Sequence, residues 1–109
     1  MVTLTATFKT PADTASFDEH YSTTHAPLMK KVPGLLKMEV TRFTKMLTPP
    51  NSMLAEQPYL QCTMYWADKD AFKAAMASEE NKAAGADLMS FAGPLVSMCI
   101  GNAEEVSLS

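Results

Sequence analysis

Four segments of the chain alternate apolar with polar residues at a period of two, which is the pattern of a β-strand that buries one face. They are residues 2–9, 36–46, 59–66 and 95–101. In the first segment the polar positions are Thr3, Thr5 and Thr7, so this strand is expected to have a β-branched polar second face. In the second segment the alternation weakens after Thr41, as it does where a strand bends or bulges.

Two longer segments repeat apolar residues at helical spacing. The first runs from about residue 13 to residue 31 and contains Pro27, whose missing amide disfavours an uninterrupted helix, so we expect a kink or a restart near Ala26. The second runs from about residue 69 to residue 91 and includes Ser78, a residue type that often caps helices. We therefore expect two helical segments that meet at this serine.

The order of these elements is β-α-β-β-α-β. It predicts an α+β fold of ferredoxin-like topology, in which a four-stranded antiparallel sheet has both helices on one face. A chain of 109 residues has no room for a second folded domain, so residues 1–109 are expected to form one domain. The loop at residues 47–58 is the longest connection, and we expect it to border a ligand pocket or to pack on a dimer partner.

The sheet face that the helices leave uncovered is predicted to be polar but interrupted by Phe43, Tyr59 and Tyr65. Because such aromatic residues would form an exposed patch in a monomer, we expect this face to meet its twin in a homodimer. The alternative is that the face meets water.

Composition narrows the class of protein. Hydrophobic residues make up 47% of the chain and charged residues 19%, which is typical of a globular domain. The net charge of -3 disfavours nucleic-acid binding, since phosphate neutralisation requires clustered Lys and Arg. No apolar stretch approaches the roughly 20 residues of a membrane span, and the chain begins with a strand pattern, so we expect a cytoplasmic protein.

The sequence contains no recognisable cofactor or metal motif. Cys62 and Cys99 lie in apolar strand patterns without the spacing of zinc or redox sites, so both are expected to be buried, reduced thiols. No Gly-rich phosphate loop, GxSxG elbow or metal-spaced His/Asp/Glu set is found, and we expect no cofactor and no metal. The nine methionines are explained by core packing or by the wall of a pocket for an apolar ligand.

Several short segments together resemble the EthD family, which is named for a protein of ethyl tert-butyl ether degradation. They are His25-Ala26-Pro27-Leu28, Lys31-Val32-Pro33-Gly34-Leu35, Tyr59 to Tyr65, Ala71-Phe72, Ser78 with Glu80, and Asp87 with Phe91. The resemblance covers nearly the whole chain. It implies a ferredoxin-like subunit that pairs into a dimeric α/β barrel, with a pocket between sheet and helices for a small apolar or aromatic molecule. The reactions of related barrels vary, so the fold does not fix the reaction.

His25 is the candidate catalytic residue, because an imidazole takes and gives protons near neutral pH. The alternative is a structural hydrogen bond that orders the helix before Pro27. His20 lies five residues earlier, about 140° away around a regular helix, so it is expected at the solvent edge and not on a shared metal. Asp87 is expected to be a surface or capping group, and nothing in the sequence brings it to His25.

Five further residues are candidate ligand contacts. Tyr21 and Tyr65 are suited to hydrogen-bonding a carbonyl or phenol, although buried tyrosines often find only a local partner. The other candidates are Phe43, Met64 and Trp66.

Three functions remain open. The first is an enzyme without cofactor that acts on a small apolar or aromatic carbonyl compound, in degradation or secondary metabolism. The second is a non-catalytic binding or accessory protein of an oxygenase pathway, and the third is a dimeric structural protein. A cavity reached by the His25 ring together with a second polar group would favour the enzyme.

Overall fold

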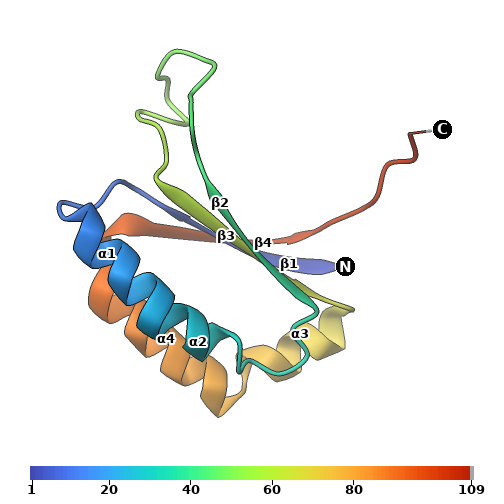
Figure 1. Ribbon diagram of the computed structural model, residues 1–109. Helices are drawn as coiled ribbons and strands as arrows, with labels where there is room; N and C mark the ends of the chain where they lie inside the picture. The colour runs from blue at the N-terminus through green and yellow to red at the C-terminus, as the bar shows by residue number, and fades with distance from the viewer. Residues whose placement is uncertain (109) are drawn as a thin grey trace.

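The computed structural model describes residues 1–108 and contains the expected order of strands and helices (Figure 1). The strands are β1 (Val2–Phe8), β2 (Lys37–Arg42), β3 (Leu60–Trp66) and β4 (Val96–Asn102). The helical elements are α1 (Thr14–His20), η1 (Tyr21–His25), α2 (Ala26–Met29), α3 (Lys69–Met76), α4 (Glu79–Ala92) and the short η2 (Gly93–Leu95). In residues 1–108 no helix is long and apolar enough to cross a membrane.

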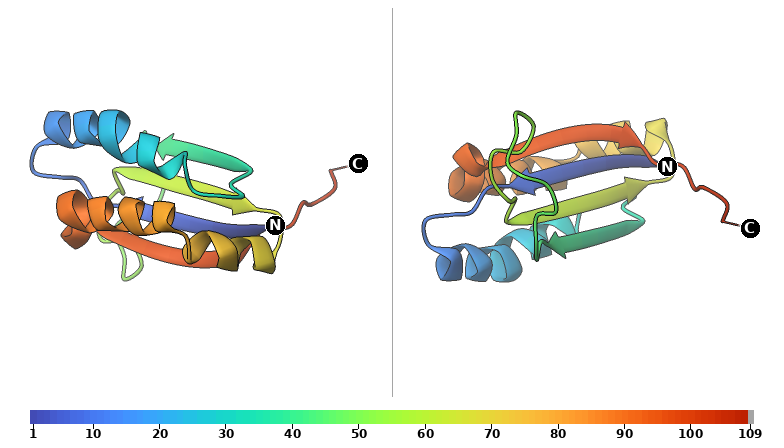
Figure 2. Two further views of the ribbon diagram at one scale, coloured as in Figure 1. Left: turned by 90° about the horizontal axis from the view of Figure 1, so that it is seen from below. Right: turned by 90° about the horizontal axis from the view of Figure 1, so that it is seen from above.

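The strands form one antiparallel sheet in the order β2-β3-β1-β4. The helices lie on one face of this sheet, and the other face has no helical cover (Figure 2). This confirms the predicted ferredoxin-like α+β fold. The pairing of two such sheets into a barrel stays a prediction.

The two faces follow from the period-two patterns of the central strands. Residues at alternate positions of β1 and β3 are buried under the helices, and Leu60 and Trp66 are fully buried. Between them lie the polar positions of the uncovered face, where Thr5 is aligned with Thr63 on one side and Cys99 on the other. Cys99 is exposed there, so the prediction of a buried thiol is wrong for Cys99 and confirmed for Cys62.

The turn after α2 explains much of the Val-Pro-Gly-Leu motif. The indole of Trp66 donates a hydrogen bond of 3.1 Å to the carbonyl of Pro33. Gly34 has φ of 74°, a conformation that favours glycine, and a Cβ at this position would lie 3.4 Å from the Trp66 ring. The ring also packs edge-on against Phe72 with centroids 5.1 Å apart. The motif therefore anchors the start of β2 on the core.

The second helical region divides where the sequence predicts. α3 ends at Met76, and the Ser78 hydroxyl caps α4 by accepting a 3.1 Å hydrogen bond from the Asn81 amide. This break lets α4 take its own direction across the sheet (Figure 1).

The long connection between β2 and β3 differs from the prediction. β2 ends at Arg42, so the weakened pattern up to residue 46 belongs to the loop, which projects away from the helix layer (Figure 1). Tyr59 was expected on the uncovered face, but its hydroxyl donates to Asp18 of α1 at 2.8 Å, and its ring packs edge-on against Phe17. The prediction for Tyr59 is wrong because it precedes β3, and an anion on α1 holds its phenol.

Candidate active site between the sheet and the helices

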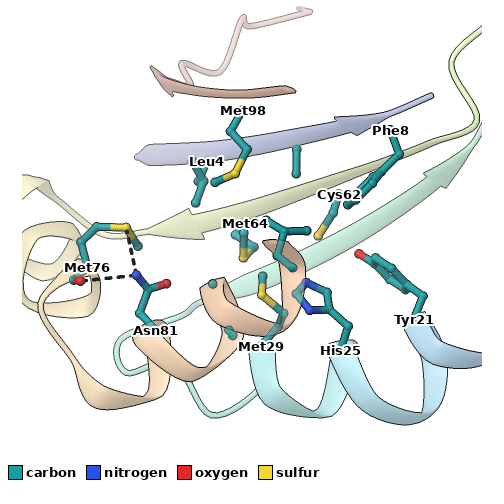
Figure 3. Close-up of a pocket in the computed structure, with 14 residues that line it drawn as sticks. Leu4, Phe8, Tyr21, His25, Met29, Cys62, Met64, Met76, Asn81 and Met98 are labelled. Carbon is teal, nitrogen blue, oxygen red and sulfur yellow. Dashed lines mark hydrogen bonds between the residues drawn. The ribbon is translucent and has the colours of Figure 1, made fainter. Parts of the chain in front are cut away.

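A cavity of about 100 Å³ lies between the helices and the covered face of the sheet (Figure 3). Its wall is mostly apolar and includes thioethers from both layers. These are Met29, Met64, Met76 and Met98. The polar side chains that reach the cavity are Tyr21, His25, Cys62 and Asn81.

A π-helical turn, η1, places the first of these polar groups. The amide of Ala26 donates to the carbonyl of Tyr21, five residues earlier, instead of four as in an α-helix. Because this wider turn holds one more residue, His25 comes about one turn after His20 and lies on the same side of the helix. The predicted separation of the two rings, which assumed a regular helix, is therefore wrong. The restart near Ala26 is confirmed, since α2 begins there.

The two imidazoles share one carboxylate. Asp87 lies 3.0 Å from His25 through Oδ2 and Nδ1, and 2.8 Å from His20 through Oδ1 and Nε2. A carboxylate only accepts hydrogen bonds, so each of these ring nitrogens donates its N–H. The prediction that Asp87 is a surface or capping group apart from His25 is wrong.

A pattern in the sequence does point to this aspartate. Asp87 falls within the apolar stripe of α4 formed by Ala84, Leu88 and Phe91, at spacings of three and four residues. An acid in an inward stripe needs a buried partner, since an unpaired buried charge is costly. The helical spacing therefore carries the information that a partner exists, but not which residue it is.

Exposure rises steadily along the three groups. The exposed fraction of the side chain is 3% for His25, 15% for Asp87 and 35% for His20. The ring of Phe91 lies against both imidazoles, with centroids 4.4 Å from His20 and 5.1 Å from His25. The pair of hydrogen bonds thus joins the cavity to the protein surface.

The charge state of His25 follows from its burial. Burial lowers the pKa of its imidazole, and this outweighs the neighbouring Asp87, which raises it. Near neutral pH the ring is therefore uncharged. Since Nδ1 holds its proton toward Asp87, Nε2 carries the lone pair, and the ring that bears it lines the cavity. His25 is set up as a base toward anything in the cavity.

Tyr21 is the adjacent hydrogen-bond donor. Its ring centroid lies 5.4 Å from that of His25, and both side chains point into the cavity (Figure 3). Burial raises the pKa of Tyr21, and the neighbouring Cys62 adds to the shift, so the phenol stays protonated. Burial also raises the pKa of Cys62, so this residue is a thiol and not a nucleophilic thiolate.

The remaining candidate ligand contacts are divided between the cavity and other places. Met64 lines the cavity with Tyr21. Trp66 is buried in the neighbouring core beside Phe72, and Tyr65 lies on the uncovered face, where its hydroxyl donates to Glu39 at 2.7 Å. Phe43 borders a separate surface pocket at the base of the long loop. Trp66, Tyr65 and Phe43 are thus outside the lining of the cavity.

Two other expectations concern the surroundings of the site. The loop at residues 47–58 was expected to border the pocket, but none of its residues lines this cavity, because the loop projects from the opposite side of the sheet. Within residues 1–108, no group of three or more His, Cys, Asp or Glu side chains is arranged to hold a metal ion.

Comparison with known proteins gives a family and a fold. An uncharacterized 11.0 kDa protein from the thcB-thcC intergenic region of Rhodococcus erythropolis is 32% identical over 106 residues, covering 97% of this chain and 98% of its own. The crystal structure of an ethyl tert-butyl ether degradation family protein from Bacillus halodurans is 43% identical, with a TM-score of 0.83, and the alignment covers 95% of this chain and 99% of that one.

A more distant structure shares the fold alone. SnoaB, a cofactor-independent oxygenase from Streptomyces nogalater, is 18% identical with a TM-score of 0.65, over 99% of this chain and 97% of its own. The sequence model of the EthD domain matches residues 9–94, from the end of β1 through the turn before β4. This chain therefore belongs to the EthD family.

Proposed function

We propose that the protein is an enzyme that transfers a proton on a small apolar or aromatic carbonyl compound without a cofactor. The observation that carries this proposal is the pairing of a buried base with a buried donor at one cavity. His25 presents a lone pair there while Asp87 holds its other nitrogen, and Tyr21 presents a protonated phenol.

The two groups are suited to different atoms of such a compound. Tyr21 donates a hydrogen bond to the carbonyl oxygen, and His25 Nε2 takes a proton from the adjacent carbon. The electron pair of that C–H bond moves onto the oxygen as an enolate, which the Tyr21 hydroxyl stabilises. The imidazolium formed at His25 is stabilised by Asp87 and returns the proton to the same or another carbon.

The neighbourhood of His25 favours this role over a purely structural one. A structural histidine needs its hydrogen bond to the protein, whereas His25 makes that bond through Nδ1 and still lines a cavity. A well-placed general base contributes about 10²-fold to 10⁴-fold in rate. SnoaB, which is named a cofactor-independent oxygenase, has the same fold and is consistent with chemistry that needs no bound group.

The second candidate is a binding or accessory protein for such a compound in an oxygenase pathway. The observation that favours it is the lining itself, because four thioethers give an adaptable apolar wall and a carrier needs no base.

One experiment separates the two candidates. Small ketones and phenols are screened by thermal shift, and each compound that binds is then incubated in D₂O with the wild-type protein, His25→Ala and His20→Ala. The enzyme is expected to exchange the proton beside the carbonyl for deuterium, seen by NMR. His25→Ala should slow this exchange by about 10²-fold or more, and His20→Ala much less. Binding without exchange would support the carrier, and no binding by any compound would contradict both.

We further propose that the protein is a homodimer paired through the uncovered face of the sheet. No element of residues 1–108 covers this face, where Tyr65 and five threonines lie. They are Thr3, Thr5, Thr7, Thr41 and Thr63. Two such faces packed together would form the dimeric barrel that the family resemblance implies.

A further inference from the structure

The cavity has a second polar group that the proposed proton transfer does not use. Asn81 lies in the first turn of α4, and its side-chain amide nitrogen donates to the carbonyl of Met76 at 3.3 Å and lies 3.8 Å from the sulfur of the same residue. Because a backbone carbonyl only accepts hydrogen bonds, the nitrogen of the amide must face Met76. The orientation of the amide is thereby fixed, and its oxygen faces the other way.

That oxygen is turned toward the cavity. Figure 3 shows Asn81 at one end of the lining and His25 with Tyr21 at the other, with Met29 and Met64 between them. No group in residues 1–108 donates a hydrogen bond to Oδ1 of Asn81. An acceptor thus waits at one end of an otherwise apolar space, opposite the base and the phenol.

Helix capping does not explain this oxygen. The backbone amide of Asn81 is bound by Ser78, and its side-chain nitrogen ties α4 to the end of α3. Both of these contacts use nitrogen atoms. The oxygen is left for a molecule that enters the cavity.

We propose that the cavity selects compounds with two polar ends, a carbonyl oxygen that lies at Tyr21 and His25 and a hydroxyl that donates to Oδ1 of Asn81. This inference rests on the proposed function, because it concerns the ligand of the same cavity. A compound without the hydroxyl leaves Oδ1 unpaired against apolar atoms, and sites built to bind a hydroxyl reject analogues that lack it.

The volume limits the size of the apolar middle. An engineered cavity of about 150 Å³ holds benzene, and this cavity measures about 100 Å³. Methionine side chains adapt their shape, so the wall can widen slightly around a ligand. The expected ligand therefore has one small ring at most, or an equally compact branched chain.

Matched ketones test the inference. We would label the methionine methyl groups with ¹³C and measure the affinities of cyclohexanone, 4-methylcyclohexanone and 4-hydroxycyclohexanone by NMR titration. The wild-type protein should bind the hydroxy ketone about fivefold to tenfold more tightly than the methyl ketone, as expected for one neutral hydrogen bond. The methyl ketone has the same shape without the donor, so this comparison needs no variant.

Two variants assign the preference to the amide oxygen. Asn81→Leu removes the oxygen at similar volume and should abolish the preference while cyclohexanone affinity stays within about twofold. Ser78→Ala disturbs the same helix junction but keeps the oxygen, and it should retain the preference. A preference that survives in Asn81→Leu would overturn the inference.

The outcomes also separate this inference from the proposed function. Equal binding of the methyl and hydroxy ketones by the wild-type protein would overturn the role of Asn81 and leave the proton transfer intact. Failure of all three ketones to bind would contradict both.

Discussion

Replacing Asp87 tests the shared carboxylate without knowledge of the substrate. Asp87→Asn keeps the shape of the side chain but offers one acceptor and one donor in place of two acceptors. The amide oxygen is expected to turn toward His25, which is buried, and the NH₂ toward His20, which is partly exposed. His20 can then change its tautomer and give its proton to water, whereas the same change at His25 would place an N–H in the apolar cavity.

The magnitudes follow from burial. Asp87→Leu leaves Nδ1–H of His25, at 3% exposure, without a partner, and such a loss costs about 1–3 kcal/mol. The half-exposed His20 finds water and adds little. Asp87→Asn keeps the bond to His25 but loses its ionic character, so about 0.5–1 kcal/mol is expected. For a domain of this size each kcal/mol lowers the melting temperature by about 4–8 °C.

The assay combines thermal unfolding with ¹⁵N NMR of the imidazole nitrogens. At pH 7 to 8 both the wild-type protein and Asp87→Asn should show His25 protonated at Nδ1 and unprotonated at Nε2, while Asp87→Leu should show a mixture of tautomers. Equal melting temperatures for the two variants would refute the reasoning. So would a wild-type His25 that carries its proton on Nε2, because it could not be the base.

Three further predictions concern the whole molecule. Because burial lowers the pKa of His25, the unfolded chain binds its proton first, so stability present above about pH 6.5 is lost as the pH falls through the folded value; His25→Phe should weaken this dependence in urea unfolding. Light scattering should show a dimer at micromolar concentration and a monomer for Thr5→Arg, and a wild-type monomer would exclude the barrel. Removing residues 51–55 should change ligand affinity by less than about twofold, and a larger loss would place the loop at the cavity.

The parts of the fold that were predicted correctly depend on local periodicity. Alternate positions of β1 and β3 are buried as their patterns predict, because a pleated strand has no other way to separate its faces. The division of the second helical region at Ser78 was also visible, since a hydroxyl capping group acts on amides only a few residues away.

The errors arose where a distant element decides the outcome. Cys99 belongs to β4, and which of its alternating positions are buried depends on its register with β1 and on how far the helices extend over that edge. Tyr59 was assigned by alternation, but Asp18 on α1 holds its hydroxyl. Asn81 was not considered at all, because its nitrogen contacts are local and its free oxygen becomes evident only when the cavity is seen.

The pairing of His20 with His25 has a local cause that the sequence does contain. Between them, the hydroxyl of Thr23 donates to the carbonyl of Glu19 at 2.6 Å, and that of Ser22 donates to the carbonyl of Asp18 at 3.0 Å. Hydroxyls that bind carbonyls of the preceding turn compete with the backbone amides there and bend or widen a helix.

Pro27 adds to this effect, because it lacks an amide and cannot continue the ladder of hydrogen bonds on the far side of η1. A run of Ser-Thr-Thr shortly before a helical proline is thus the pattern from which a π-turn follows. Since a π-turn brings residues five apart to one face, two histidines at that spacing become partners of a single acid on the neighbouring helix. The turn that looked like a defect in the helix is what assembles the candidate site.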